Sequence, residues 1–212
     1  MKIIRRATWI MGVAGVVFLA YGATCFADAE ESSEALYRKG SDLLGTEQGD
    51  PNILEEARQV FEAILKQDPT SPFGYMGMSR YHRAKAYLAG PQYVQEPLQR
   101  VALPLALKAV ELAPDFLEAH TVLAMTYLAL QRIEEAEKEA RRAIELPGYT
   151  AKAHYTLGEV LIQKGDPAGA LRELEIALGE ETNPMSRLSI LQRMGQLSPP
   201  EKCNAPHFSS RS

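Results

Sequence analysis

Two consecutive stretches of this chain, residues 117–150 and 151–184, carry one pattern at a spacing of 34 residues, without a gap. Small and large residues recur in both stretches in the same order. The matching pairs are His120 and His154, Leu123 and Leu157, Ala124 and Gly158, Tyr127 and Leu161, Ala136 and Ala170, Ala140 and Leu174, Ala143 and Ala177, and Ile144 and Leu178. Such a period is typical of chains whose units pack on one another, because a single unit cannot bury its own apolar face.

Within each stretch the spacing predicts two helices joined by a turn. Leu123 and Tyr127 are four residues apart, so they share one face of the first helix. The small residue Ala124 lets the second helix approach closely, and the alanines of that second helix do the same from the other side. Residues 165–167 read Gly-Asp-Pro, which are turn formers, and they mark the turn of the second stretch.

These residues resemble the tetratricopeptide repeat, whose 34-residue pattern runs from an aromatic residue through Leu-Gly, Tyr and Ala to a large apolar residue and Pro. The resemblance covers roughly residues 34–196. It implies an all-α fold, an α-solenoid of about four helix-turn-helix repeats with a C-terminal capping helix. We expect the repeats at about 33–71, 72–116, 117–150 and 151–184, and the capping helix at 185–196.

The first two repeats are longer than the others and need insertions between their helices. Residues 46–52 are rich in turn formers and can hold the first insertion. The second repeat needs about 11 extra residues to keep the 34-residue register, and residues 89–97 are a natural place for them.

The N-terminus has the layout of a secretory signal. Lys2, Arg5 and Arg6 precede a stretch without charge, residues 7–27, which ends in small residues. We expect residues 1–27 to be a cleaved signal peptide, and therefore an exported protein in the periplasm or elsewhere outside the cytoplasm. The alternative is an uncleaved inner-membrane anchor, because about 20 apolar residues can span a bilayer.

The C-terminal residues, 197–212, lack apolar periodicity, so we predict a disordered tail. Cleavage of the signal removes Cys25 and leaves Cys203 in this tail, where we expect a free thiol.

Charge and motifs narrow the classes of function. The net charge is -4, which argues against nucleic acid as the main partner, because phosphate binding draws on clustered Lys and Arg. The sequence has no nucleophile elbow, phosphate loop or dinucleotide fingerprint, and we predict no enzyme and no cofactor. His120 and His154 share one repeat position that the family fills with an aromatic ring, so we interpret them as packing residues rather than metal ligands.

In the resemblance family, first helices line a concave groove through repeat positions 2, 5, 9 and 12. We therefore predict that another protein or peptide segment binds there. The candidate groove residues are Tyr37, Phe73, Met76, Arg80, Arg83, Thr121, Met125, Leu128, Lys152, Tyr155 and Glu159, and the same positions include Ser41, Glu118 and Ile162.

The mixture of Met, aromatic and Leu side chains with a few Arg favours an extended or helical apolar segment in this groove. The Lys and Asn set with which several tetratricopeptide co-chaperones hold a C-terminal carboxylate is not repeated here. Some of the side chains can instead pack against the neighbouring repeat.

The resulting hypothesis is a non-catalytic scaffold or assembly factor of the cell envelope. Two other classes remain open. In one, residues 7–27 stay in the membrane and the protein is an anchored subunit of an envelope complex. In the other, the long insertions build a ligand-binding or enzymatic site around residues 89–97.

Overall fold

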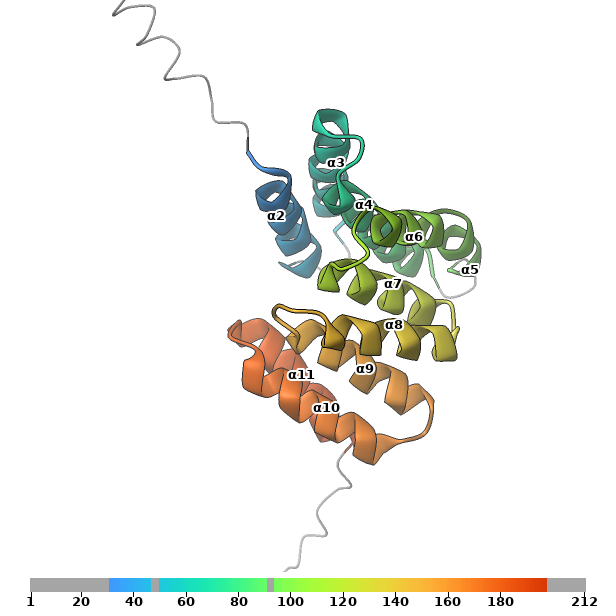
Figure 1. The fold of residues 1–212 in the computed structure, drawn as a ribbon, viewed down its shortest axis with the longest axis vertical. Coiled ribbons are helices and arrows are strands. Elements are labelled where there is room, and N and C mark those ends of the chain that lie inside the picture. The colour runs from blue at the N-terminus through green and yellow to red at the C-terminus, as the bar shows by residue number, and fades with distance from the viewer. Residues whose placement is uncertain (1–30, 47–49, 91–93, 198–212) are drawn as a thin grey trace, which may run out of the picture.

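The computed structural model describes residues 31–46, 50–90 and 94–197, and the regular structure in these ranges is helical. Antiparallel helix pairs follow one another in a curved stack, from α2 at one end to α10 and α11 at the other (Figure 1). The predicted all-α solenoid of helix-turn-helix repeats is confirmed. The predicted signal segment, residues 1–27, and the tail from residue 198 onward lie outside the described residues.

Each predicted repeat contains one pair of helices or helical runs. The capping segment is α11. The pairs are α2 (Ser33–Thr46) with α3 (Pro51–Gln67), α4 (Pro72–Leu88) with the run formed by α5 (Gln95–Pro97), η2 (Leu98–Ala102) and α6 (Leu103–Leu112), α7 (Leu117–Ala129) with α8 (Ile133–Glu145), and α9 (Ala151–Gln163) with α10 (Pro167–Glu180), before α11 (Pro184–Leu197).

Turn chemistry fixes where the helices begin. The Asp50 carboxylate accepts a hydrogen bond from the Asn52 amide at 2.8 Å, and Asp166 does the same for Gly169 at 2.8 Å, each just before a proline that opens the helix. Gly165 and Gln131 hold the same position in consecutive repeats, and both have a positive φ, 79° and 60°. The turn thus requires a left-handed residue, which Gly adopts freely and Gln does not.

Small side chains allow the helices to approach, as the repeat pattern predicts. Ala136, Ala140 and Ala143 of α8 are fully buried, and their counterparts Ala170 and Ala177 of α10 are too. These residues face the first helix of their own repeat or the next repeat, so the stripe of small residues is the packing surface of the stack.

The extra residues of the first two repeats mainly lengthen the helices. α3 and α4 have 17 residues each, against 13 in α7 and α9. In the second repeat the helical run before α6 passes through one π-helical segment, η2. Pro104, the second residue of α6, lies just after this segment and has no backbone N–H to donate.

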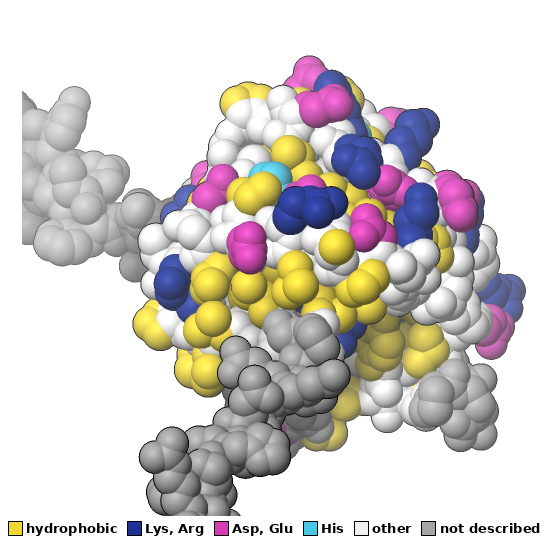
Figure 2. All heavy atoms as spheres, turned by 90° about the horizontal axis from the view of Figure 1, so that it is seen from below, with side chains coloured by type: hydrophobic (Ala, Val, Ile, Leu, Met, Phe, Trp, Pro, Cys, Tyr) yellow, Lys and Arg dark blue, Asp and Glu magenta, His cyan; other side chains and the backbone are white. Residues whose placement is uncertain are grey.

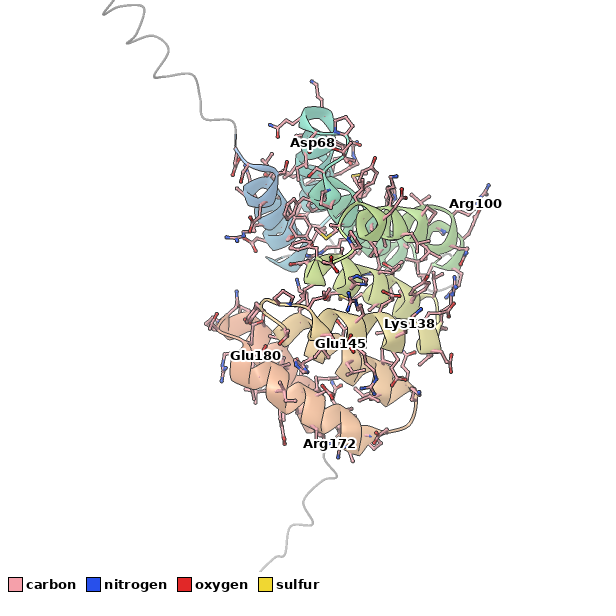
Figure 3. The ribbon with its side chains drawn as sticks, in the orientation of Figure 1. Asp68, Arg100, Lys138, Glu145, Arg172 and Glu180 are labelled. Carbon is pink, nitrogen blue, oxygen red and sulfur yellow. The ribbon has the colours of Figure 1, made fainter. Side chains whose placement is uncertain are left out.

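The outer surface of the stack is charged. Figure 3 labels Lys138 and Glu145 on α8 and Arg172 and Glu180 on α10, and each of them points into solvent. Among the described residues, no helix is long and apolar enough to cross a membrane.

The C-terminal end of the stack is more apolar. Ile176, Met185, Leu188 and Leu191 are each at least 44% exposed. Figure 2 looks at the molecule from this end and shows hydrophobic side chains gathered across it. On the other face of α11, Ile190 is buried, and Leu197, which the sequence assigns to the tail, is the last residue of the helix and packs partly buried against the core there.

Candidate functional site

Four of the predicted groove residues meet in one cavity. It has a volume of about 510 Å³ and opens between α2, α4, α7 and α9. Tyr37, Phe73, Arg80 and Lys152 line it, and so does Glu118. Because each of the four helices is the first helix of its repeat, the cavity lies on the concave side that the repeat pattern predicts.

The carboxylate of Glu118 contacts several of the side chains that line this cavity. The Tyr37 hydroxyl donates to Oε1 of Glu118 at 3.0 Å, and Lys152 Nζ lies 3.5 Å from the same oxygen. Arg80 donates to the Tyr37 hydroxyl at 3.1 Å and forms an ion pair with Glu118 at 3.7 Å. Glu118 of the third repeat therefore contacts side chains from the first, second and fourth repeats.

Burial and this network shift the protonation of the groups involved. Burial raises the pKa of Tyr37 to about 12, so its hydroxyl stays protonated and available as a donor. Burial by itself lowers the pKa of Arg80. The contacts with Tyr37 and Glu118 outweigh burial, so the pKa of Arg80 is raised above its ordinary value. The pKa of Lys152 is lowered, first by burial and then by Arg80, although Glu118 acts in the opposite direction.

Aromatic rings form the apolar wall of the cavity. The ring of Phe73 lies 5.7 Å from that of Tyr37 and 5.5 Å from that of Phe116, measured between centroids. The last contact is edge-to-face, an arrangement that aromatic pairs favour. Phe116 is not one of the predicted groove positions, since it is the residue just before the third repeat begins at Leu117.

Arg83 and Met125, two further predicted groove residues, contact each other and line neither of the cavities described here. The Arg83 Nη2 donates to the Met125 sulfur at 3.8 Å. Burial, and after it the charge of Arg80, lowers the pKa of Arg83 to about 10. The Nη1 atom of Arg83 is buried and has no hydrogen-bond partner in the described part of the chain.

Two predicted groove residues are not on the surface. Met76 and Thr121 are fully buried, and the Thr121 hydroxyl donates to the Leu117 carbonyl within its own helix. In the family, position 5 of the repeat faces the concave groove, but in this protein neighbouring helices cover the side chains of Met76 and Thr121 at that position. For these two residues the alternative of packing between repeats holds, and Leu128 lines neither of the cavities described here.

Tyr155 and Glu159 line a second, smaller cavity of about 370 Å³ between α9 and α11. Arg193 of α11 donates to both carboxylate oxygens of Glu159, at 2.7 and 2.9 Å. Arg193 lies 34 residues after Glu159, so α11 has the register of the first helix of a fifth repeat.

The two histidines of the repeat pattern each bind a glutamate. His120 Nδ1 lies 2.7 Å from Glu139, and His154 Nδ1 lies 2.7 Å from Glu173, each glutamate being on the second helix of the same repeat. The interval of 19 residues in both repeats was a signal in the sequence that residue-type reasoning missed. In the part of the chain that the structure describes, no three His, Cys, Asp or Glu residues come together as a metal site.

Comparison with known proteins supports the same fold. A family model described as tetratricopeptide repeat matches residues 117–148. Tetratricopeptide repeat protein 7B of Homo sapiens is 29% identical over 136 residues, and the match covers 62% of this chain and 16% of that protein. The chain thus spans only a small part of that relative.

Solved structures extend the likeness over most of the chain. A thermophilic TPR protein of Thermus thermophilus matches with a TM-score of 0.63 at 20% identity, covering 87% of this chain and 95% of that one. Human IFIT1, solved as a dimer with m7Gppp-AAAA, matches with a TM-score of 0.62 at 21% identity, covering 79% and 35%. At these identities the likeness shows the fold alone. The repeat match and the shared architecture together support a tetratricopeptide-repeat solenoid as the fold of this chain.

Proposed function

We propose that this protein is a non-catalytic scaffold that holds a segment of a partner protein on its concave side, in the cell envelope. The cavity between α2, α4, α7 and α9 carries this proposal, because four repeats contribute side chains to it and it stays open. Its lining combines aromatic rings with cationic groups, the kind of surface that binds both apolar and polar parts of a peptide.

A pair of charge reversals tests the groove as the binding site. Met125→Glu together with Lys152→Glu adds two carboxylates at predicted groove positions, the second of them beside Glu118, and we expect the double variant to lose capture of its partner by crosslinking in the native envelope. Lys152 is 44% exposed and Met125 is half-buried, so helicity by circular dichroism should persist.

The matched control is Leu107→Glu together with Lys138→Glu. Both residues are exposed on second helices, and the net change in charge is the same. The control should keep full capture. Equal capture by the two double variants would exclude the groove as the site.

The proposed location rests on the sequence of residues 1–27. N-terminal sequencing of the protein purified from its native cells distinguishes export with cleavage from an uncleaved anchor. A start at Asp28 supports the exported scaffold, and an intact N-terminus supports an anchored subunit. The proposal of a ligand or enzymatic site around residues 89–97 stays open, since residues 91–93 lie outside the described part.

A further inference from the structure

The outer face of α11 has the pattern of a first helix without its second helix. In the 34-residue register, Leu188 and Leu191 hold the positions of His154 and Leu157 in α9. His154 bonds to Glu173 on the second helix of its own repeat, and Leu157 is 1% exposed. Leu188 and Leu191 are 58% and 50% exposed. The positions that receive a second helix in the fourth repeat are therefore open to solvent at the apolar end seen in Figure 2.

The sequence that follows α11 does not match a second helix. In the same register, Asn204 and Arg211 replace Ala170 and Ala177, the small buried residues with which α10 packs on its neighbours. Pro206 would fall in the middle of the helix, where proline removes a backbone hydrogen bond and clashes with the carbonyl four residues earlier. A helix that covers the outer face of α11 is therefore expected from another molecule.

The charged side chains of α11 bond back to the stack. Arg187 donates to the carbonyls of Leu178 and Glu181, at 2.6 and 2.7 Å. Arg193 forms an ion pair with Glu159 at 2.7 Å. These two arginines are the charged residues of α11, so the side chains on its outer face are uncharged. Two copies of this face can consequently meet without bringing like charges together.

The opposite end of the stack does not offer a matching surface. There α2 exposes the charged residues Glu34, Arg38, Lys39 and Asp42. Contact between α11 of one copy and α2 of the next would bury these charges, which is costly unless each finds a partner. Contact between two α11 helices avoids this cost and closes as a two-fold pair. Nothing lies within 4 Å of a Cβ built on Gly195, so a second helix can approach α11 closely there.

We infer that this protein forms a two-fold dimer in which α11 packs against α11 of a second copy, through Met185, Leu188 and Leu191. The inference goes beyond the scaffold function and does not rest on it. Such a dimer carries two concave grooves. A partner with two binding segments would therefore be held more tightly than by a single groove.

Sedimentation velocity of the purified full chain measures this association. A reducing agent is present throughout, so that disulfides of Cys25 or Cys203 cannot join two chains. Over about 1–100 µM we expect the mass to rise from that of one chain to that of two. Leu188→Glu with Leu191→Glu should raise the dissociation constant at least about tenfold, because four carboxylates would meet in the interface.

The matched control is Leu88→Glu with Leu107→Glu. These leucines lie outside α11 and are 49% and 44% exposed, and their replacement adds the same charge. The control should keep the dissociation constant of the native protein. Circular dichroism checks that both double variants keep their helix content.

A mixing experiment distinguishes contact between two α11 helices from contact between α11 and another surface. Leu188→Lys with Leu191→Lys should also weaken the dimer when it is alone. Mixed with the double glutamate variant, it should form a mixed dimer, because lysines of one copy then face glutamates of the other. An interface between α11 and a different surface would gain nothing from mixing.

Several outcomes would overturn the inference. One is the mass of a single chain over the whole range, whether residues 198–212 or a helix of another protein then covers α11. The others are a dimer that survives the double glutamate variant, equal weakening by the control, and a mixture of the two charged variants that forms no dimer.

Discussion

Single residues set how closely the first two repeats approach. Phe61 of α3 is fully buried at a repeat position that holds Ala140 and Leu174 further along. Its ring fits because Gly40 and Gly77 face it, and a Cβ built on Gly77 would lie only 2.1 Å from the ring. The large side chain of Phe61 on α3 thus occupies space that the glycines on α2 and α4 leave free.

Gly77→Ala tests this match. We expect the free energy of unfolding to fall by about 1–3 kcal/mol, because the ring of Phe61 must move within a packed core. Chemical denaturation measures the change.

Gly179→Ala is the control, since nothing lies within 4 Å of a Cβ at that helical position. It should stabilise the protein by about 0.5–1 kcal/mol through helix propensity. A loss of stability in Gly179→Ala, or none in Gly77→Ala, would contradict this account.

The sequence predicted that Phe61 belongs to the packing face of its helix. It could not predict that Gly77 lies under the ring, because that depends on how α4 rotates against α3. The groove residues show the same limit. Position 5 of the repeat correctly places Met76 and Thr121 on the first helices, but only the structure reveals that neighbouring helices cover them.

At the level of helices, a buried histidine joins the two members of a repeat. His120 on α7 bonds to Glu139 on α8 at 2.7 Å, and its other ring nitrogen lies 2.8 Å from the Pro114 carbonyl. The hydrogen bond to Glu139 is the largest cause that raises the pKa of His120 above its usual value, followed in the opposite direction by burial. The protonated ring is therefore favoured in the folded state.

This coupling predicts a pH dependence of stability. A raised pKa contributes stability that is fully present below the ordinary histidine value of 6.5 and is lost as the pH rises through the folded value. The difference in unfolding free energy between the native protein and His120→Phe should therefore shrink from pH 5.5 to pH 8.5.

Urea denaturation over this pH range measures that difference. Comparison with the variant removes the contributions of other groups, such as His82, whose pKa burial lowers. Parallel curves for the two proteins would show that Glu139 does not favour the charged ring.

At the scale of the whole molecule, each repeat packs mainly on the next one. The C-terminal helix α11 packs on α9 and α10 of a single repeat, and Ile190 is its one buried side chain in the described part, supported by Met194 and Leu197. Solenoids of this kind open from their ends, because a terminal repeat has half the interface of an inner one.

Ile190→Ala should therefore act locally. Removal of the buried side chain costs about 2–5 kcal/mol at its site, which should raise amide hydrogen exchange in α11 strongly and leave α4 unchanged. Exchange followed by mass spectrometry separates the two helices. A uniform rise along the chain would indicate that the stack unfolds as a single cooperative unit.

The order of the repeats was predictable because residues of the same kind recur every 34 positions in the sequence, most regularly in residues 117–184. The cavity was predictable in position but not in its contacts. Tyr37 reaches Glu118 across 81 residues of sequence, and no local pattern links the two. The contact of Arg83 with Met125 likewise joins residues 42 positions apart in the sequence.

The network around Glu118 also has a mechanical consequence. A solenoid of stacked helix pairs bends and extends through small rotations between adjacent repeats. Because Glu118 contacts Tyr37, Arg80 and Lys152 from the other three repeats, it connects all four repeats on the concave side of the stack. These contacts oppose any motion that moves the first helices of the repeats apart on the concave side.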